Sequence, residues 1–463
     1  MAEESRPGRV GYPVLISAVA ALGGFLFGYD TAVVNGTIGA LERHFRADPG
    51  RLGFAVASAL LGSAVGAIIA GRVADRAGRV RAMRWTALLF AVGSFGSGVA
   101  ESLVTFSVWR FLGGIAVGAA SVIAPAYIAE VAPARIRGRL GSLQQLAIVL
   151  GIFLALAIND VIAHAAGSPD APFWFGVPAW RWMFWVEVLP AIVYGAGAFF
   201  VPESPRYLVT RGRERAAEEV LARIGEPDPA GRVAEIRESI GVERPSRISD
   251  LRAPRGFVWP IVWVGIALSV FQQFVGINVI FYYSTALWHS VGFTESDSMR
   301  ISSITGIINI VTTLIAIAFV DRFGRRPLLL AGSIGMTLTL GAMAWLFATA
   351  PLEAGGAPVL SGGHGTAALV AANLYVFAFG FSWGPVVWVL LGEMFNNRIR
   401  GAALAIAAAA QWIANWLVTL TFPGLAKTGL GLAYGLYAGA AALSFAFVLR
   451  FVKETRGRTL EEM

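Results

Sequence analysis

The feature that most constrains the fold is a succession of apolar segments, each about as long as a membrane-spanning helix. A helix needs about 20 residues to cross the hydrocarbon core of a bilayer. Charged residues make up only 14% of the chain, against about 25% in a soluble domain, so a bilayer has to cover its surface. The hydropathy pattern predicts twelve spans: 12–34, 54–74, 83–100, 104–128, 142–162, 182–201, 257–287, 301–320, 328–350, 368–391, 402–422 and 430–450.

The basic residues orient these spans. Thirty of the 37 Lys and Arg residues fall in the ends and loops of one side, six fall on the other side, and Arg110 lies within the fourth span. By the positive-inside rule, both termini are expected in the cytoplasm. This placement also argues against nucleic-acid binding, despite the formal charge of +8. The arginine-rich, Ala- and Gly-rich composition is typical of a bacterium, so the inner membrane is the expected location.

Residues for covalent or metal chemistry are scarce. The chain has no cysteine, its four histidines are scattered without metal-ligand spacing, and it has no phosphate-binding GxxxxGK[ST] loop. We therefore expect no metal, no cofactor and no direct use of ATP. A nucleophile paired with a base is also missing, so an enzyme is not expected.

Two motifs recur six spans apart. Asp75-Arg-Ala-Gly-Arg79 after the second span matches Asp321-Arg-Phe-Gly-Arg325 after the eighth, and Glu130 and Glu393 each begin a Glu-x4-Arg-x-Arg-Gly motif. This repetition predicts two six-helix halves. The expected division is a first bundle at 1–202, a cytoplasmic helical linker at 203–256, a second bundle at 257–452 and a tail at 453–463.

The repeated motifs are interpreted as a conformational latch at the cytoplasmic rim. Glu130 and Glu393 are each expected to pair with a guanidinium of a neighbouring loop, and the pairs to break as the halves rock. The alternative is that these loops only set topology. The predicted latch residues are Asp75, Arg76, Arg79, Glu130, Arg137, Asp321, Arg322, Arg325, Arg326, Glu393 and Arg400.

The seventh span contains the polar stretch FQQFVGINVIFYY at 271–283. Gly276 is expected to interrupt the helix, and a broken helix exposes its backbone only toward protein or a wet cavity. Side-chain amides both donate and accept hydrogen bonds, as hydroxyls do, so a ligand rich in hydroxyls is predicted. The alternative is a set of interhelical hydrogen bonds. The residues expected at this level are Gln145, Gln272, Gln273, Asn278, Tyr282, Trp388 beside a break at Gly384–Pro385, Gln411 and Trp412.

Two charges inside predicted spans of the first half are conspicuous. Asp30 is late in the outward-running first span and Arg110 is early in the inward-running fourth, so both fall in the outer half and can pair. Intramembrane ionisable groups are costly and usually functional. We interpret the pair as a proton switch in which protonation of Asp30 releases Arg110; the alternative is a structural ion pair.

Several motifs together resemble the sugar porter family of the major facilitator superfamily: GGFLFGYDTAV (23–33), the DRxGR loops, PESPRYL (202–208), QQFVGINVIFYY (272–283), SWGPVVWVLLGEMF (382–395) and ETRGRTLEE (454–462). The resemblance implies an all-α membrane protein with twelve transmembrane helices in two bundles and amphipathic helices between them. It also implies sugar contacts from Gln145, Gln272, Gln273, Asn278, Trp388 and Gln411, with Phe27, Tyr282 and Trp412 nearby. Proton-coupled members of the family have an acid at the position of Asp30, where many uniporters have Asn.

The expected function is import of a monosaccharide, a hexose such as glucose or else xylose, by proton symport through alternating access. Ile152 favours a hexose slightly, because some pentose-type members carry a polar residue there. A facilitative uniporter and a non-transporting sugar sensor are the alternatives. The GxxxG pairs Gly62/Gly66 and Gly114/Gly118 are interpreted as internal packing, so a functional monomer is expected.

Overall fold

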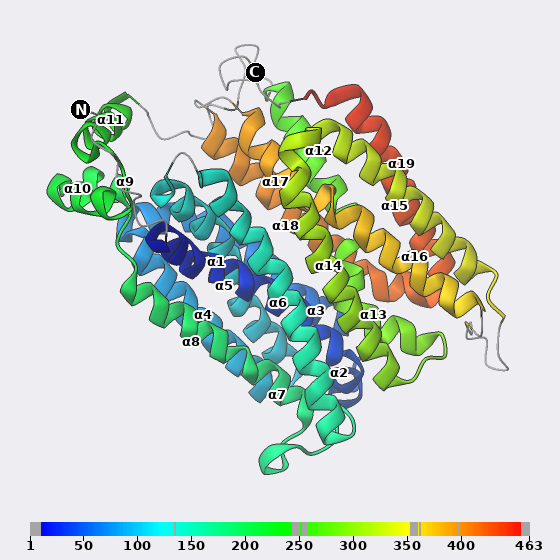
Figure 1. Cartoon of the computed structure of the whole chain (residues 1–463). Helices are drawn as coiled ribbons and strands as arrows, with labels where there is room; N and C mark the ends of the chain where they lie inside the picture. The colour runs from blue at the N-terminus through cyan, green and yellow to red at the C-terminus, as the bar shows by residue number, and fades with distance from the viewer. Residues whose placement is uncertain are drawn as a thin grey trace.

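The computed structural model describes a nearly all-helical chain at residues 11–133, 136–242, 251, 258–351, 360, 363–395 and 399–454. Figure 1 shows the helices as two neighbouring groups, α1–α8 and α12–α19, with α9–α11 at one end. The helices of the predicted spans in the first group are α1 (Gly11–Val33), α3 (Pro49–Ala77), α4 (Arg79–Val99), α5 (Leu103–Val131), α6 (Arg137–Ala166), α7 (Ala179–Val186) and α8 (Val188–Phe200). Those of the second are α12 (Pro260–Phe274), α13 (Ile277–Ser290), α14 (Glu295–Phe323), α15 (Arg325–Ala348), α16 (Gly363–Gly380), α17 (Trp383–Met394), α18 (Arg400–Thr428) and α19 (Leu430–Phe451).

The predicted all-helical membrane fold is confirmed. Eleven of the described segments are long and apolar enough to cross a membrane, and three of them are helix pairs: α7 with α8, α12 with α13, and α16 with α17. The remaining predicted span is α4, which has 21 residues but begins with Arg79, Arg81 and Arg84. These arginines lower its mean hydropathy at the end where the positive-inside rule places them.

Small residues allow a close helix contact between α3 and α5. A Cβ atom built on Gly62 or Gly66 of α3 would lie 2.1 Å from a backbone carbonyl oxygen of α5. One built on Gly114 or Gly118 of α5 would lie 1.9 or 2.0 Å from a carbonyl oxygen of α3. The two GxxxG motifs therefore interlock within one chain, as small-xxx-small pairs do in membrane helices.

Both predicted breaks occur, one of them at a different position. Gly276 separates α12 from α13 with φ of +82°, a backbone conformation that favours glycine. The second break lies at Phe381 and Ser382, between α16 and α17, and not at Gly384–Pro385 as predicted. Pro385 falls in the first turn of α17, where a backbone N–H would have no partner within the helix. Its ring would clash with the carbonyl group four residues earlier in a continuous helix, so the break lies on that side of the proline.

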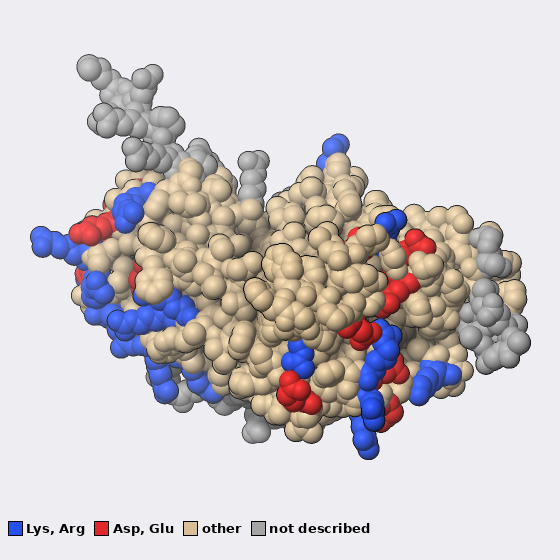
Figure 2. Space-filling model, turned by 90° about the horizontal axis from the view of Figure 1, so that it is seen from below, with Lys and Arg blue, Asp and Glu red and all other residues tan. Residues whose placement is uncertain are grey.

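The linker helices are α9 (Pro205–Thr210), α10 (Glu214–Arg223) and α11 (Pro229–Val242), and the end of the molecule where they lie is called the linker end. The predicted linker 203–256 also includes 243–250 and 252–257, which lie outside the described residues, and the domain bounds remain a prediction. Figure 2 shows blue Lys and Arg side chains gathered at the linker end, and acidic and basic side chains mixed at the other.

The two groups of helices pack along α3 with α18 and along α6 with α14. Away from the linker end, polar contacts join them. Asn35, in the short helix η1 (Val34–Gly36), donates to Ser284 Oγ (3.2 Å) and accepts from the backbone N–H of Thr285 (2.8 Å). His164 of α6 also lies 3.3 Å from Arg300 of α14. The molecule is therefore closed at this end, which we call the far end.

Candidate functional site

A chain of amides follows the break between α12 and α13. Asn278 donates from Nδ2 to Gln273 Oε1 (2.6 Å), and Gln273 donates to Gln272 Oε1 (3.4 Å). Gln272 in turn donates to the carbonyl oxygens of Trp383 (2.8 Å) and Gly384 (3.1 Å) at the start of α17. Three of the predicted sugar residues are thus brought together, and one of them, Gln272, uses its amide N–H groups on the backbone of another broken span.

The other predicted sugar residues come from both helix groups. Phe27 of α1 meets Trp412 of α18 edge to face, with ring centroids 5.1 Å apart. Gln411, next to Trp412, is 7% exposed, and its Oε1 has no hydrogen-bond partner among the described residues. Gln145 of α6 and Trp388 of α17 are half-buried. In the described part of the chain, no hydrogen bond or ring contact connects Gln145, Trp388 or Gln411 to the amide chain.

Two aromatic residues of these broken spans have other surroundings. Tyr282 is 1% exposed and interacts electrostatically with Asp30 and Arg110, so it adjoins the predicted proton switch. Trp383 is fully buried and donates from Nε1 to Leu329 O and Ser333 Oγ of α15, both at 3.0 Å. The sequence did not predict that Tyr282 lies beside Asp30 and Arg110 of the other helix group.

Asp30 and Arg110 form the predicted ion pair. Arg110 Nη1 bonds Asp30 Oδ1, and Nη2 donates to Oδ2 at 3.2 Å, so the contact is bidentate. Asp30 is 5% exposed and Arg110 is 2% exposed. Two buried charges at hydrogen-bonding distance stabilise one another, whereas loss of either leaves the other uncompensated.

Glu187 is a third charge that sequence reasoning missed. It lies at the junction of α7 and α8, is 0% exposed, and interacts electrostatically with both Asp30 and Arg110. Neither of its carboxylate oxygens has a hydrogen bond of standard geometry among the described residues, but the carboxylate also interacts with the Ser94 side chain of α4. The available signal was that Glu187 is the one acid in the predicted sixth span, 182–201.

At the linker end, each helix group has one bidentate arginine–glutamate pair, and we call these two pairs the rim clamps. Arg79 donates to Glu130 from Nε and Nη2, both at 3.0 Å, and also pairs with Asp75 at 3.1 Å. Arg325 donates to Glu393 from Nε (3.1 Å) and Nη2 (2.8 Å). The predicted partners of the two glutamates are therefore found, and each clamp joins helices of one group.

A second acid completes each rim clamp, and the prediction omitted both. Glu203 accepts from the backbone N–H of Arg79 (2.9 Å) at the start of α4. Glu454 accepts from the N–H groups of Arg325 (3.0 Å) and Arg326 (2.9 Å) at the start of α15. A carboxylate at a helix N-terminus satisfies free N–H groups and the helix dipole. The signal was an acid just after the last span of each half.

The remaining predicted latch residues have less defined surroundings. The carbonyl oxygen of Arg76 accepts from Tyr207 Oη (3.3 Å), which ties the loop to α9. Arg326 donates to Leu449 O of α19 (2.7 Å), and Arg322 is exposed. The side chains of Arg137, Asp321 and Arg400 lie outside the described residues.

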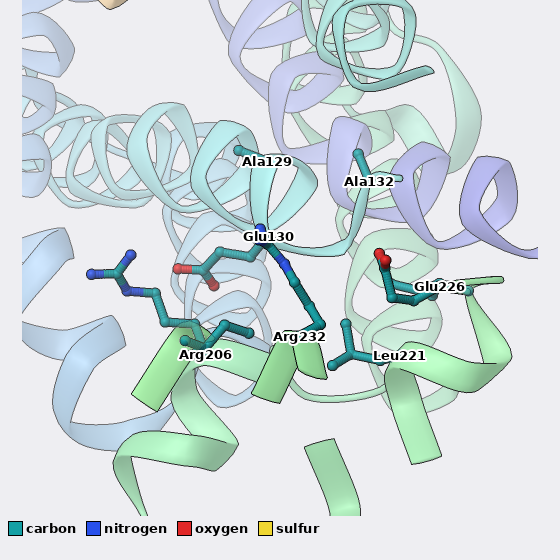
Figure 3. A pocket seen from close by; sticks show the side chains of 9 residues that line it. Ala129, Glu130, Ala132, Arg206, Leu221, Glu226 and Arg232 are labelled. Atoms are coloured by element: carbon teal, nitrogen blue, oxygen red, sulfur yellow. The ribbon is translucent and has the colours of Figure 1, made fainter. Parts of the chain in front are cut away.

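Figure 3 shows a cavity of about 330 Å³ where the end of α5 meets the linker helices. Its lining includes Glu130 of the first rim clamp together with Arg206 and Arg232 from the linker helices. The cavity contains none of the predicted sugar residues. The described part of the chain also contains no cluster of three or more His, Asp or Glu side chains able to hold a metal ion.

Comparisons with known proteins agree with this architecture. Residues 16–463 match the family model described as "Sugar (and other) transporter". A glucose transport protein of Synechocystis sp. is 59% identical over 98% of this chain and 97% of its own length. The D-xylose-proton symporter of Escherichia coli is 39% identical over 98% of this chain and 95% of its own. A partially occluded, inward-open structure of the E. coli xylose transporter XylE superimposes with a TM-score of 0.82 at 36% identity, covering 96% of this chain and all of the other.

Proposed function

Because the chain belongs to the sugar (and other) transporter family, we propose that it imports a monosaccharide, glucose or xylose, by proton symport through alternating access. The two relatives described above carry these sugars in their names, and one is a proton symporter. The proton is the coupling ion, and no cofactor, ATP or nucleic acid takes part. The protein acts as a monomer in the inner membrane, with the linker end and both termini in the cytoplasm, as the excess of basic residues at that end favours.

The observation that carries the proposal is the buried Asp30–Arg110 pair with Glu187 beside it. A proton that arrives on Asp30 removes its charge and weakens its bond to Arg110. The Arg110 guanidinium then has a second carboxylate nearby, because Glu187 interacts electrostatically with Arg110 and neither of its oxygens makes a hydrogen bond of standard geometry among the described residues. Exchanging one carboxylate for another keeps the buried cation paired, so the change costs far less than isolating it.

Tyr282 supports a link from this switch to the sugar. It adjoins Asp30 and Arg110 and belongs to α13, where Asn278 of the amide chain lies one turn earlier. Amides suit a sugar because they donate to and accept from hydroxyls without a charge penalty. Trp388 and Trp412 offer apolar ring faces for the C–H faces of the same guest. The rim clamps brace each bundle, and we expect them to loosen as the bundles rock.

The test is uptake of labelled monosaccharides into proteoliposomes, with and without an imposed pH gradient. We expect a gradient to drive uphill accumulation of glucose or xylose and sugar addition to alkalinise the outer medium. Asp30→Asn should abolish accumulation but keep sugar exchange, whereas Asp160→Asn, a control acid on α6, should keep both. Sugar flux that ignores the gradient would indicate a uniporter, and binding without flux a sensor; either result contradicts the proposal.

A further inference from the structure

The loop between α6 and α7 forms a short hairpin, residues 167–178, at the far end, and we call it the aromatic hairpin. A β-bridge joins Pro172 to Pro178, and the N–H of Phe173 donates to the carbonyl oxygen of Val177 (2.8 Å). At its tip, Phe175 has a φ of +57° and is 93% exposed. A bulky side chain in this left-handed region is strained, and such strain is characteristic of functional sites.

The tip belongs to a continuous series of aromatic rings. Trp174, which is 63% exposed, and Phe175 both pack on Trp182, with ring centroids 5.6 and 6.3 Å apart. Trp182 meets Trp185 at 5.2 Å, and Trp185 stacks on Phe95 of α4 at 5.9 Å. The series therefore runs without interruption from the hairpin tip to the surface of a membrane span.

Phe95 lies on the lipid-facing side of α4. It is 55% exposed, and so are other large apolar residues one or two turns away on the same face, including Leu88 (65%) and Val92 (43%). Residues spaced by three or four positions share a helix face, and an apolar face of a membrane span contacts acyl chains. Because Phe95 falls in the last two turns of α4, the lipid-facing stripe ends where the aromatic series begins.

The opposite side of the hairpin is bound to the protein. Asp170 accepts a hydrogen bond from Arg43 Nε at 2.6 Å, which ties the base of the hairpin to α2 (Ile38–Phe45). Trp182 donates from Nε1 to the carbonyl oxygen of Trp174 (3.3 Å). The base of the hairpin, with Asp170, thus faces the helix bundle, and the exposed rings of the tip face outward.

We propose that the aromatic hairpin inserts Trp174 and Phe175 into the headgroup region of the adjacent leaflet. Indole rings prefer this region, because one edge is polar and the ring body is apolar. Insertion removes from water two rings that the fold leaves exposed, and it explains why the strained Phe175 points away from the protein. It also extends the lipid contact of α4 beyond the hydrocarbon core.

The absence of cysteine makes a direct test simple. A nitroxide on Phe175→Cys in proteoliposomes is compared with one on Glu42→Cys, an exposed position of α2 at the same end. We expect collision with oxygen to exceed collision with a water-soluble nickel complex several-fold at 175, and the reverse at 42. Adding Trp174→Ser to the labelled Phe175→Cys variant should shift its ratio toward water, while the melting temperature stays unchanged.

A tip label as accessible to the nickel complex as the label at 42 would overturn the proposal. So would protection of the label by monosaccharide in detergent without lipid, because that result assigns the rings to carbohydrate stacking. Unchanged collision ratios in the Trp174→Ser background would show that the aromatic side chains do not hold the tip in the leaflet, and would also count against it.

Discussion

Residues of the same type have different roles in this molecule, and the degree of burial alone does not distinguish these roles. Gln272 and Gln411 are both nearly buried, but the first bonds two backbone carbonyl oxygens and the second has a free Oε1 among the described residues. The sequence predicted both as sugar ligands because amides in apolar runs are conspicuous. It could not assign their partners, since those come from helices distant in the chain. Glu187 was overlooked although it is the one acid in the predicted sixth span.

Replacing these two glutamines is expected to give opposite results. Gln272→Ala leaves the carbonyl oxygens of Trp383 and Gly384 without their donor, at a cost of about 1–3 kcal/mol in the free energy of unfolding. Gln411→Ala removes no hydrogen bond between described residues but removes an acceptor for a sugar hydroxyl, which we expect to weaken sugar binding by about 1 kcal/mol, or roughly fivefold. Thermal unfolding in detergent and equilibrium sugar binding measure the two effects.

Each variant serves as the control for the other. A lowered melting temperature for Gln411→Ala with unchanged sugar affinity would remove Gln411 from the site. If Gln272→Ala left stability intact, the bond to α17 would have no structural importance.

At the scale of helices, the sequence predicted much and erred at junctions. The GxxxG motifs indicated close helix packing, and Gly276 indicated a helix break. Both could be predicted because the conformation and small size of glycine act at its own position. The second break was predicted at the wrong position. Pro385 correctly indicated which span is broken, but a helix can begin a few residues before a proline, so the break precedes it. The acids of the rim clamps were found only in part, because Glu203 and Glu454 act on helices that begin in other loops.

Glycine substitutions test the α3–α5 contact. Gly62→Ala or Gly114→Ala would place a methyl group 2.1 or 1.9 Å from a carbonyl oxygen, so we expect a loss of about 1–3 kcal/mol and a lower melting temperature. The control is Gly71→Ala on α3, where no heavy atom lies within 4 Å and alanine should stabilise the helix by about 0.5–1 kcal/mol. Equal effects at positions 62 and 71 would refute the interlocked packing.

Removing the acid at the start of α15 should loosen that helix end. Glu454→Ala leaves the N–H groups of Arg325 and Arg326 without their carboxylate, a loss of about 1–2 kcal/mol locally. Hydrogen exchange of the first turn of α15 is expected to accelerate, whereas Lys453→Ala should not change it. Normal protection in the Glu454 variant would mean that another group satisfies these amides.

At the scale of the whole molecule, the number of spans was predictable, because apolar length is summed over many positions; the orientation inferred from the basic residues remains a prediction. The sequence did not predict at which end of the molecule the two bundles are in contact. That closure depends on a few contacts, such as those of Asn35 with Ser284 and Thr285, whose energies are small compared with the folding of either bundle.

Asn35→Ala is therefore expected to favour the state that is open at the far end. The substitution removes two inter-bundle hydrogen bonds and leaves the bundles themselves intact. Spin labels on Glu42→Cys of α2 and His364→Cys of α16 should report a longer distance in this background. Thr349→Ala, which removes a hydrogen bond within α15 alone, is the control and should leave the distance unchanged. Identical distances in the labelled parent protein, the Asn35→Ala variant and the Thr349→Ala variant would contradict this account of closure.

The bond from Gln272 to the first turn of α17 has a mechanical consequence. Two interrupted spans share one joint, with an amide of the first holding the exposed peptide groups of the second. We therefore expect a guest that displaces Asn278 or Gln273 to displace α17 as well, without contacting α17. The two interrupted spans are thus expected to move together when a guest binds.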